Sequence, residues 1–129
     1  MAGELTAATP TCEFRYDTRG FVHAVMRVGC EMALADAKEN VAAIFELGGR
    51  TRSRVLVDMR GVRSQSREAR QYFAGAEAEK ATLAVALLIG SPVSRVLANV
   101  FLRLNPQRIP TALFTDEAAA IAWLMEQRG

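Results

Sequence analysis

Apolar and polar side chains alternate with a period of two on both sides of Arg19-Gly20, over residues 12–28. Alternation around a glycine turn predicts a β-hairpin. Over residues 34–47 the apolar positions recur at helical spacing, and Gly48-Gly49 is a typical helix end. We therefore expect two strands followed by a helix.

Two short apolar runs, at residues 54–59 and 83–89, lack polar alternation. Such runs are typical of central strands that are buried on both faces. A helix is expected between them, with Ser64 or Ser66 as its N-cap.

The second run leads into Ser91-Pro92, a typical helix start, and helical spacing then continues to Asn105-Pro106. A short strand at residues 112–114 and a helix capped by Thr115 are expected to complete the chain.

The predicted order is therefore β-β-α-β-α-β-α-β-α, which is typical of the α/β class. Because parallel crossovers are right-handed, it predicts a mixed, mostly parallel sheet with packed helices and an antiparallel strand at one edge. We expect a flexible tail over residues 1–10 and a single domain over residues 11–129. One core is expected to include Val55, Leu56, Val57, Leu83, Val85, Leu87, Val96, Val100 and Trp123.

Composition narrows the function classes. Half of the 129 residues are apolar and 23% are charged, as in packed globules, and the net charge of +2 argues against nucleic-acid binding. No apolar run reaches the roughly 18 residues of a membrane span, and the N-terminus lacks a secretory signal, so a cytoplasmic protein is expected. Cys12 and Cys30 lack metal-site spacing, which predicts free thiols and neither metal nor cofactor.

Three segments carry a family resemblance. They are Val55-Leu56-Val57-Asp58-Met59-Arg60-Gly61-Val62, Gly90-Ser91-Pro92-Val93-Ser94-Arg95, and Leu113-Phe114-Thr115-Asp116-Glu117 leading to Ala122-Trp123-Leu124. Over residues 12–127 the chain resembles the STAS fold of anti-sigma factor antagonists, and more closely an uncharacterised bacterial SpoIIAA-like branch. The resemblance implies a SpoIIAA-like fold.

Phosphorylation is implied in STAS relatives by an Asp-Ser-Ser-Gly turn shortly after the first of these segments. Here residues 63–67 read Arg-Ser-Gln-Ser-Arg, without the acidic residue and the glycine. The resemblance therefore leaves open whether Ser64 or Ser66 is modified.

The first candidate site comprises Ser91, Ser94 and Arg95 at the start of the predicted helix. Free backbone N–H groups, two hydroxyls and a guanidinium could hold a phosphate or carboxylate there. The alternative is simple capping of the helix by Ser91.

The second candidate is a basic face formed by Arg60, Arg63, Arg67 and Arg70. It could receive an acidic protein, an anionic lipid or a nucleic acid. The alternative is a solvated surface with local ion pairs, such as those of Glu68.

The third candidate is the wide apolar stripe of the helix at residues 93–104. Val93, Leu97, Phe101 and Leu104 could form a dimer interface. The alternatives are a helix face that belongs to the core and the lid of an apolar ligand pocket.

His23 is the one histidine of the chain, and no serine or cysteine is recognisably paired with it. No catalytic motif is present, so we do not expect an enzyme and assign no catalytic residue. The leading hypothesis is a non-catalytic binding or regulatory module that acts through protein partners, as a homodimer. The alternatives are a carrier or sensor of a small anionic or apolar, lipid-like ligand, and an enzyme of unknown type.

Overall fold

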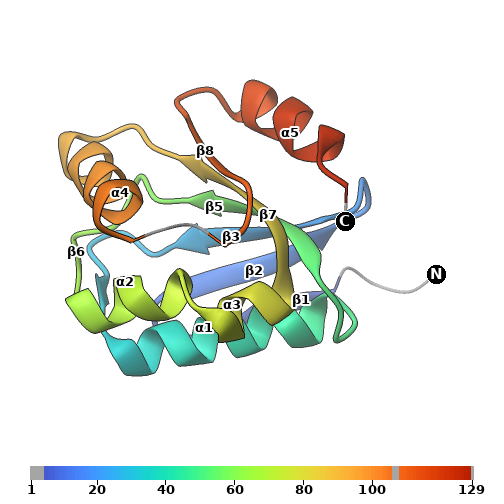
Figure 1. The fold of residues 1–129 in the computed structure, drawn as a ribbon, viewed down its shortest axis with the longest axis horizontal. Coiled ribbons are helices and arrows are strands. Elements are labelled where there is room, and N and C mark those ends of the chain that lie inside the picture. The colour runs from blue at the N-terminus through green and yellow to red at the C-terminus, as the bar shows by residue number, and fades with distance from the viewer. Residues whose placement is uncertain (1–4, 106–107, 129) are drawn as a thin grey trace.

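The computed structural model describes residues 5–105 and 108–128, which form a layered α/β domain (Figure 1). The strands are β1 (Thr6–Ala8), β2 (Cys12–Asp17), β3 (Phe21–Met26), β4 (Glu31–Met32), β5 (Ser53–Asp58), β6 (Ser64–Gln65), β7 (Thr82–Leu88) and β8 (Thr111–Phe114). The helices are α1 (Leu34–Leu47), α2 (Arg67–Phe73), α3 (Ala76–Ala81), α4 (Pro92–Leu104) and α5 (Glu117–Glu126). This order confirms the predicted α/β class.

The main sheet has six strands in the order β1-β2-β3-β5-β7-β8. The pairings of β3, β5, β7 and β8 are parallel, whereas β1 pairs with β2, and β2 with β3, in antiparallel fashion. The mixed, mostly parallel sheet is thus confirmed. The sheet has two antiparallel pairings, whereas one was expected. Strands β4 and β6 form a separate parallel pair.

The N-terminal segment is ordered where a flexible tail was predicted. Thr6 pairs with Arg15 across β1 and β2, and the backbone N–H of Tyr16 donates to the carbonyl of Leu5 at 2.9 Å. The prediction is therefore wrong for residues 6–8, because backbone hydrogen bonds rather than an apolar period hold this short strand. Residues 1–4 lie outside the described residues.

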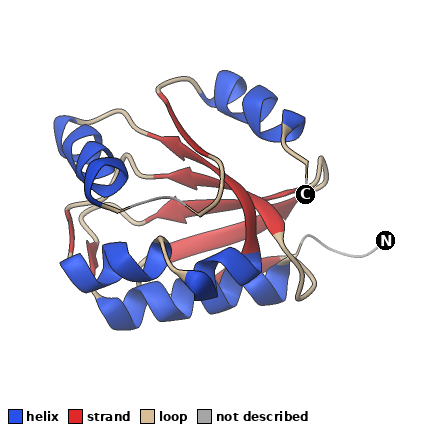
Figure 2. Ribbon diagram, viewed as in Figure 1, coloured by secondary structure: helices blue, strands red, loops and turns tan. Residues whose placement is uncertain are grey.

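The core is divided by the sheet into two clusters, so the prediction of one core is wrong. Helices α1, α2 and α3 cover one face and α5 covers part of the other (Figure 2). The first cluster includes Val22, Ile44, Val55, Met59 and Leu87. The second includes Phe21, Leu56, Leu88, Ala120 and Leu124. Because neighbouring strand residues point to opposite faces, Val55 and Leu56 belong to different clusters.

The predicted cap of α2 is confirmed, whereas the length of that helix and the cap of α5 differ from the expectations. Ser66 caps α2, since its Oγ accepts the Ala69 N–H at 3.0 Å, but the helix breaks at Gly75 and resumes as α3. Asp116, rather than Thr115, caps α5, because its carboxylate accepts the Ala119 N–H at 2.9 Å. Pro106, which was expected to help end α4, lies outside the described residues.

The loops that follow β3 and β5 touch one another. A Cβ atom at Gly61 would lie 2.9 Å from the Cα of Val28. The backbone N–H of Gly29 donates to the carbonyl of Gly61 at 2.7 Å. Gly61, within the segment that resembles STAS proteins, is therefore required by the close approach of two backbones.

Candidate functional site

Helix α4 lies beyond the carboxyl ends of the parallel strands, next to β6 (Figure 1). It follows β7 through a short turn that ends at Ser91, and Pro92 is its first residue. The hydroxyl of Ser91 accepts the N–H of Ser94 at 2.9 Å, as expected for an N-cap. The predicted start of this helix is confirmed.

The Ser94 hydroxyl is not available to an anion. Ser94 is fully buried, and its Oγ accepts the backbone N–H groups of Gly90 at 3.1 Å and Ser91 at 3.0 Å. It also donates to the Ser91 carbonyl at 3.0 Å, while Arg95 is exposed on another side of the helix. The anion site predicted from Ser91, Ser94 and Arg95 is therefore wrong for Ser94, because this side chain satisfies the donors that an anion would need.

Helix α4 buries mainly small side chains and exposes several larger aliphatic ones. Its buried residues are Ser94, Ala98 and Phe101, so small side chains predominate on the inward face. Three of its larger aliphatic residues point outward, with exposed fractions of 46% for Val93, 59% for Val96 and 62% for Leu104. Leu97, Val100 and Leu102 are half-buried. The helix therefore presents an apolar stripe to solvent.

The predicted interface is thus brought together only in part. Val93 and Leu104 are exposed, Leu97 is half-buried, and Phe101 is buried in the first core cluster. Including Phe101 is wrong, because its side chain is buried and anchors α4 to the first core cluster, against which Leu97 and Leu102 also pack. Placing Val96 in the core is wrong as well.

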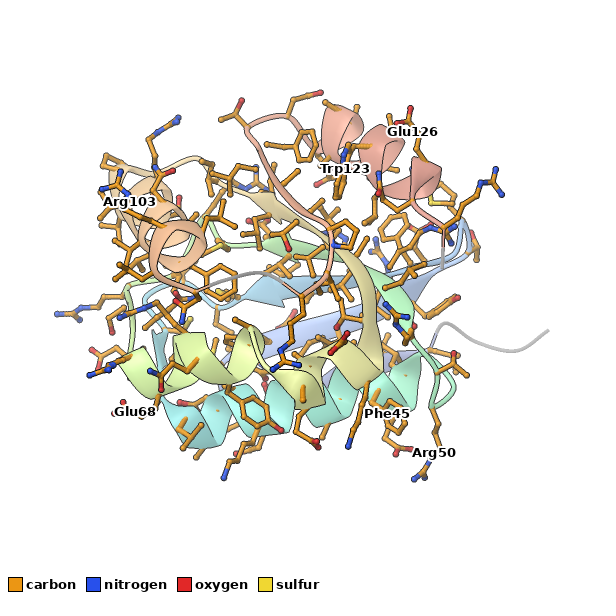
Figure 3. All side chains as sticks on the ribbon, viewed as in Figure 1. Phe45, Arg50, Glu68, Arg103, Trp123 and Glu126 are labelled. Atoms are coloured by element: carbon orange, nitrogen blue, oxygen red, sulfur yellow. The ribbon has the colours of Figure 1, made fainter. Side chains whose placement is uncertain are left out.

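The charges on α4 are all positive. Arg95 and Arg103 are exposed, and residues 92–104 contain neither aspartate nor glutamate. Figure 3 shows Arg103 projecting from α4 away from the sheet. The outward face is therefore apolar with a basic border.

The four arginines of the predicted basic face lie in different surroundings. Arg60 is held by Asp58 at 2.7 Å, and its side chain lies against Gly90. Arg63 is 3.7 Å from Glu31, and Arg67 is exposed at the start of α2. Arg70 turns inward, where its Nη1 donates to the carbonyl of Gln65 at 3.1 Å and its Nε is buried without a partner among the described residues. Arg60, Arg63 and Arg67 are thus exposed, and the last two flank β6, the strand that α4 contacts.

His23 lies on the sheet face that α5 covers in part. Its Nδ1 is 3.3 Å from Nη2 of Arg15, and its Nε2 is buried without a partner among the described residues. Burial lowers the pKa of His23, which keeps the ring neutral at neutral pH. Its strand, β3, lies inside the sheet, between β2 and β5.

Around His23, the face of β1, β2 and β3 forms an open concavity of about 500 Å³. Thr6, Glu13, Arg15 and Val25 line it together with His23. Helix α5 packs on β5, β7 and β8, so this part of the face carries no helix within the described chain. It is a second exposed surface, which the sequence did not single out.

The described ranges contain neither a candidate metal-binding cluster nor a membrane-spanning helix. Residues 5–105 and 108–128 contain no group of three or more histidine, cysteine, aspartate or glutamate side chains that could hold a metal ion. No helix of this part of the chain is long and apolar enough to cross a membrane. Cys12 is buried and Cys30 half-buried, and both are free thiols, as predicted.

Comparison with known proteins supports the fold. Residues 14–128 match DUF7793, a domain of unknown function. An uncharacterised DUF3478-family protein with a SpoIIAA-like fold, from Shewanella loihica PV-4, is 17% identical, with a TM-score of 0.59 and coverage of 96% of this chain and 98% of that one. A protein of unknown function from Arthrobacter sp. FB24 is 28% identical, with coverage of 94% and 98% and a TM-score of 0.36. No curated protein matches. The similarity to the Shewanella structure confirms the SpoIIAA-like fold inferred from the sequence.

Proposed function

This chain belongs to the DUF7793 family, and because that family is described only as a domain of unknown function, we propose its role from the geometry. It is a non-catalytic binding or regulatory module that docks a protein partner on α4. The observation that carries this proposal is the orientation of the helix, which buries Ser94 and Ala98 and exposes Val93, Val96 and Leu104. An apolar stripe of this kind is typical of a protein–protein contact.

The charges specify the partner. Arg95 and Arg103 border the stripe on α4, and Arg63 and Arg67 are exposed nearby. A protein surface with apolar residues flanked by aspartates or glutamates would match this pattern. Contact between two copies of α4 would instead place arginines against arginines with no carboxylate on either helix.

A protein fits better than a membrane surface. Membrane-surface helices combine a strongly charged polar face with tryptophan or phenylalanine on the apolar face. The exposed apolar residues of α4 are aliphatic, and its one aromatic residue, Phe101, is buried.

The non-catalytic part of the proposal rests on the surroundings of His23. The group beside its Nδ1 is the guanidinium of Arg15, a permanent cation. A catalytic histidine is usually oriented by a carboxylate or carbonyl and paired with a nucleophile. The arrangement here disfavours protonation of the ring.

The homodimer is proposed at the open face of β1, β2 and β3 rather than at α4. This face carries both signs of charge, since Glu13 pairs with Arg27 at 2.8 Å and Arg15 lies 3.7 Å from Asp17. A two-fold axis can match such a surface to itself, with the exposed Val25 at the contact.

The test introduces a photo-crosslinking residue at position 96, with position 39, exposed on α1, as a matched control. We expect position 96 to capture a protein with an acidic surface, and the purified pair to dissociate in high salt or when Val96→Glu and Leu104→Glu are introduced. Binding of the wild type to anionic vesicles, abolished by the same changes, would contradict the protein partner.

Sedimentation of purified protein tests the homodimer separately. The wild type and the Val96→Glu variant are both expected to sediment as dimers, and Val25→Glu as a folded monomer. If Val96→Glu dissociates the dimer, the dimer interface lies on α4 and not on the open sheet face. A wild type that is monomeric at high micromolar concentration would refute the dimer.

A further inference from the structure

A narrow apolar cavity of about 80 Å³ lies between the main sheet and the helices α1 and α3. Val57 and Val85 form part of its floor, and Ile44 and Ala78 part of its cover. Thr82, Val85 and Leu87 of β7 line the cavity, so its lining extends along this strand. At about 3.3 Å per residue, this stretch spans roughly 16 Å.

Gln65, which lines this cavity, has a polar atom without a partner in the described part of the chain. Gln65 and Thr82 are its polar lining residues, and Oε1 of Gln65 is buried without a hydrogen-bond partner among the described residues. Such an unsatisfied carbonyl is unfavourable unless something occupies the cavity and donates to it. Gln65 lies on β6 and Thr82 at the start of β7.

Water is a poor occupant of this cavity. A buried water needs two to four polar partners, whereas cavities lined by aliphatic and aromatic side chains stay dry and accept apolar molecules. Of the two polar lining residues, Gln65 is the one whose oxygen lacks a partner among the described residues, so the lining can orient one donor there. A molecule with an apolar chain and one terminal donor meets both conditions.

We propose that this cavity binds a small molecule with a short linear apolar chain and a terminal hydroxyl group, which donates to Oε1 of Gln65. The chain lies along β5 and β7, between Val57 and Val85 on one side and α1 and α3 on the other. A hydroxyl suits this end better than an ammonium group, because an unpaired charge would lose its hydration in apolar surroundings. The inference is independent of the partner proposed for α4.

The volume sets the size of the ligand. An apolar protein cavity of about 150 Å³ stays dry and accepts benzene. A space of about 80 Å³ therefore requires a smaller ligand. The break between α2 and α3 at Gly75 leaves two short helices over the cavity. They could adjust to a longer chain more easily than the continuous helix α1.

The experiment titrates the whole protein with the series from 1-propanol to 1-octanol, followed by amide and methyl NMR. Affinity is expected to rise about fourfold with each added methylene until the cavity is full, and then to level off. Shifts should cluster at Val57, Val85 and Gln65. A methyl ether of equal length, which cannot donate, should bind about fivefold more weakly than the alcohol.

Two variants complete the test. Gln65→Leu should abolish the preference for alcohol over ether and should raise the thermal stability of the free protein, because it removes the unpaired carbonyl. Ala78→Leu should fill the cavity and weaken every member of the series. The proposal is overturned by affinity that rises without a plateau, by shifts confined to α4, by an alcohol preference that survives Gln65→Leu, or by the absence of binding across the series.

Discussion

Arg60 forms two hydrogen bonds with the carboxylate of Asp58, from Nε to Oδ1 at 3.0 Å and from Nη2 to Oδ2 at 2.7 Å. The backbone N–H of Arg60 also donates to Oδ1, at 3.0 Å. Arg19 and Asp17 repeat this geometry at the end of β2. Burial raises the pKa of Asp58, but the hydrogen bonds from Arg60 outweigh it and keep the pKa below its ordinary value.

The equivalent pair at Asp17 predicts a dependence of stability on acid. Hydrogen bonds from the Arg19 side chain hold the pKa of Asp17 at about 2, below the ordinary 3.8. A carboxylate with a depressed pKa stabilises the fold above pH 3.8, and this contribution is lost as the pH falls from 3.8 toward 2. Asp17→Asn should therefore lose less stability than the wild type over this range.

Thermal unfolding between pH 5 and pH 2 measures this effect. Glu39→Gln, which removes an exposed carboxylate from α1, is the matched control and should follow the wild-type curve. Parallel curves for Asp17→Asn and the wild type would show that the pair contributes nothing to the folded state.

The hydroxyl of Ser94 should matter more than that of Ser91, although Ser91 is the N-cap. Ser94→Ala leaves the N–H groups of Gly90 and Ser91 without their acceptor and is expected to cost about 1–3 kcal/mol. Ser91→Ala removes one cap and should cost about 1 kcal/mol. Urea unfolding of both variants measures the difference, and the reverse order would contradict the capping network.

Substitutions on the buried and the exposed face of α4 should differ in their effect on the free energy of unfolding. Phe101→Ala removes the buried anchor of the helix and is expected to cost about 3–5 kcal/mol. Val96→Glu changes an exposed position and should alter the free energy of unfolding by no more than about 0.5 kcal/mol. A large loss of stability in Val96→Glu would place that residue in the core after all.

The two thiols should differ in reactivity. Burial raises the pKa of Cys12 to about 12, and the half-buried Cys30 has a raised pKa for the same reason. Because the thiolate is the nucleophile, alkylation of the native protein near pH 8 should modify Cys30 first and Cys12 only after unfolding. Mass spectrometry of partly alkylated protein checks this order, with urea-unfolded protein as the control. Equal labelling rates in the native state would contradict the burial of Cys12.

Long periodic segments could be predicted from the sequence, and short ones could not. The helix at residues 34–47 was predicted with its observed bounds, because its spacing is regular over four turns. Strands β1, β4 and β6 have three residues or fewer, too few to show a period of two. Backbone pairing holds these strands in place, and the pattern of side chains in the sequence does not indicate it.

The candidate site was harder to predict for a different reason. A wide apolar stripe shows that α4 is amphipathic but not which part of the stripe meets the sheet. The signal that could have helped is the row Ser94, Ala98 and Phe101, whose small members permit close packing. The concavity at His23 depends on where α5 ends its coverage of the sheet, which only the assembled fold reveals.

The contact between Gly61 and Val28 has a practical consequence. Because the two backbones touch and Gly29 is hydrogen-bonded to Gly61, the loops after β3 and β5 cannot be displaced separately. Val28 itself is 94% exposed, so a spin label or fluorophore attached there meets no steric obstacle. A reporter at position 28 would therefore register movement at the end of β5, although helix α1 separates position 28 from β5 in the sequence.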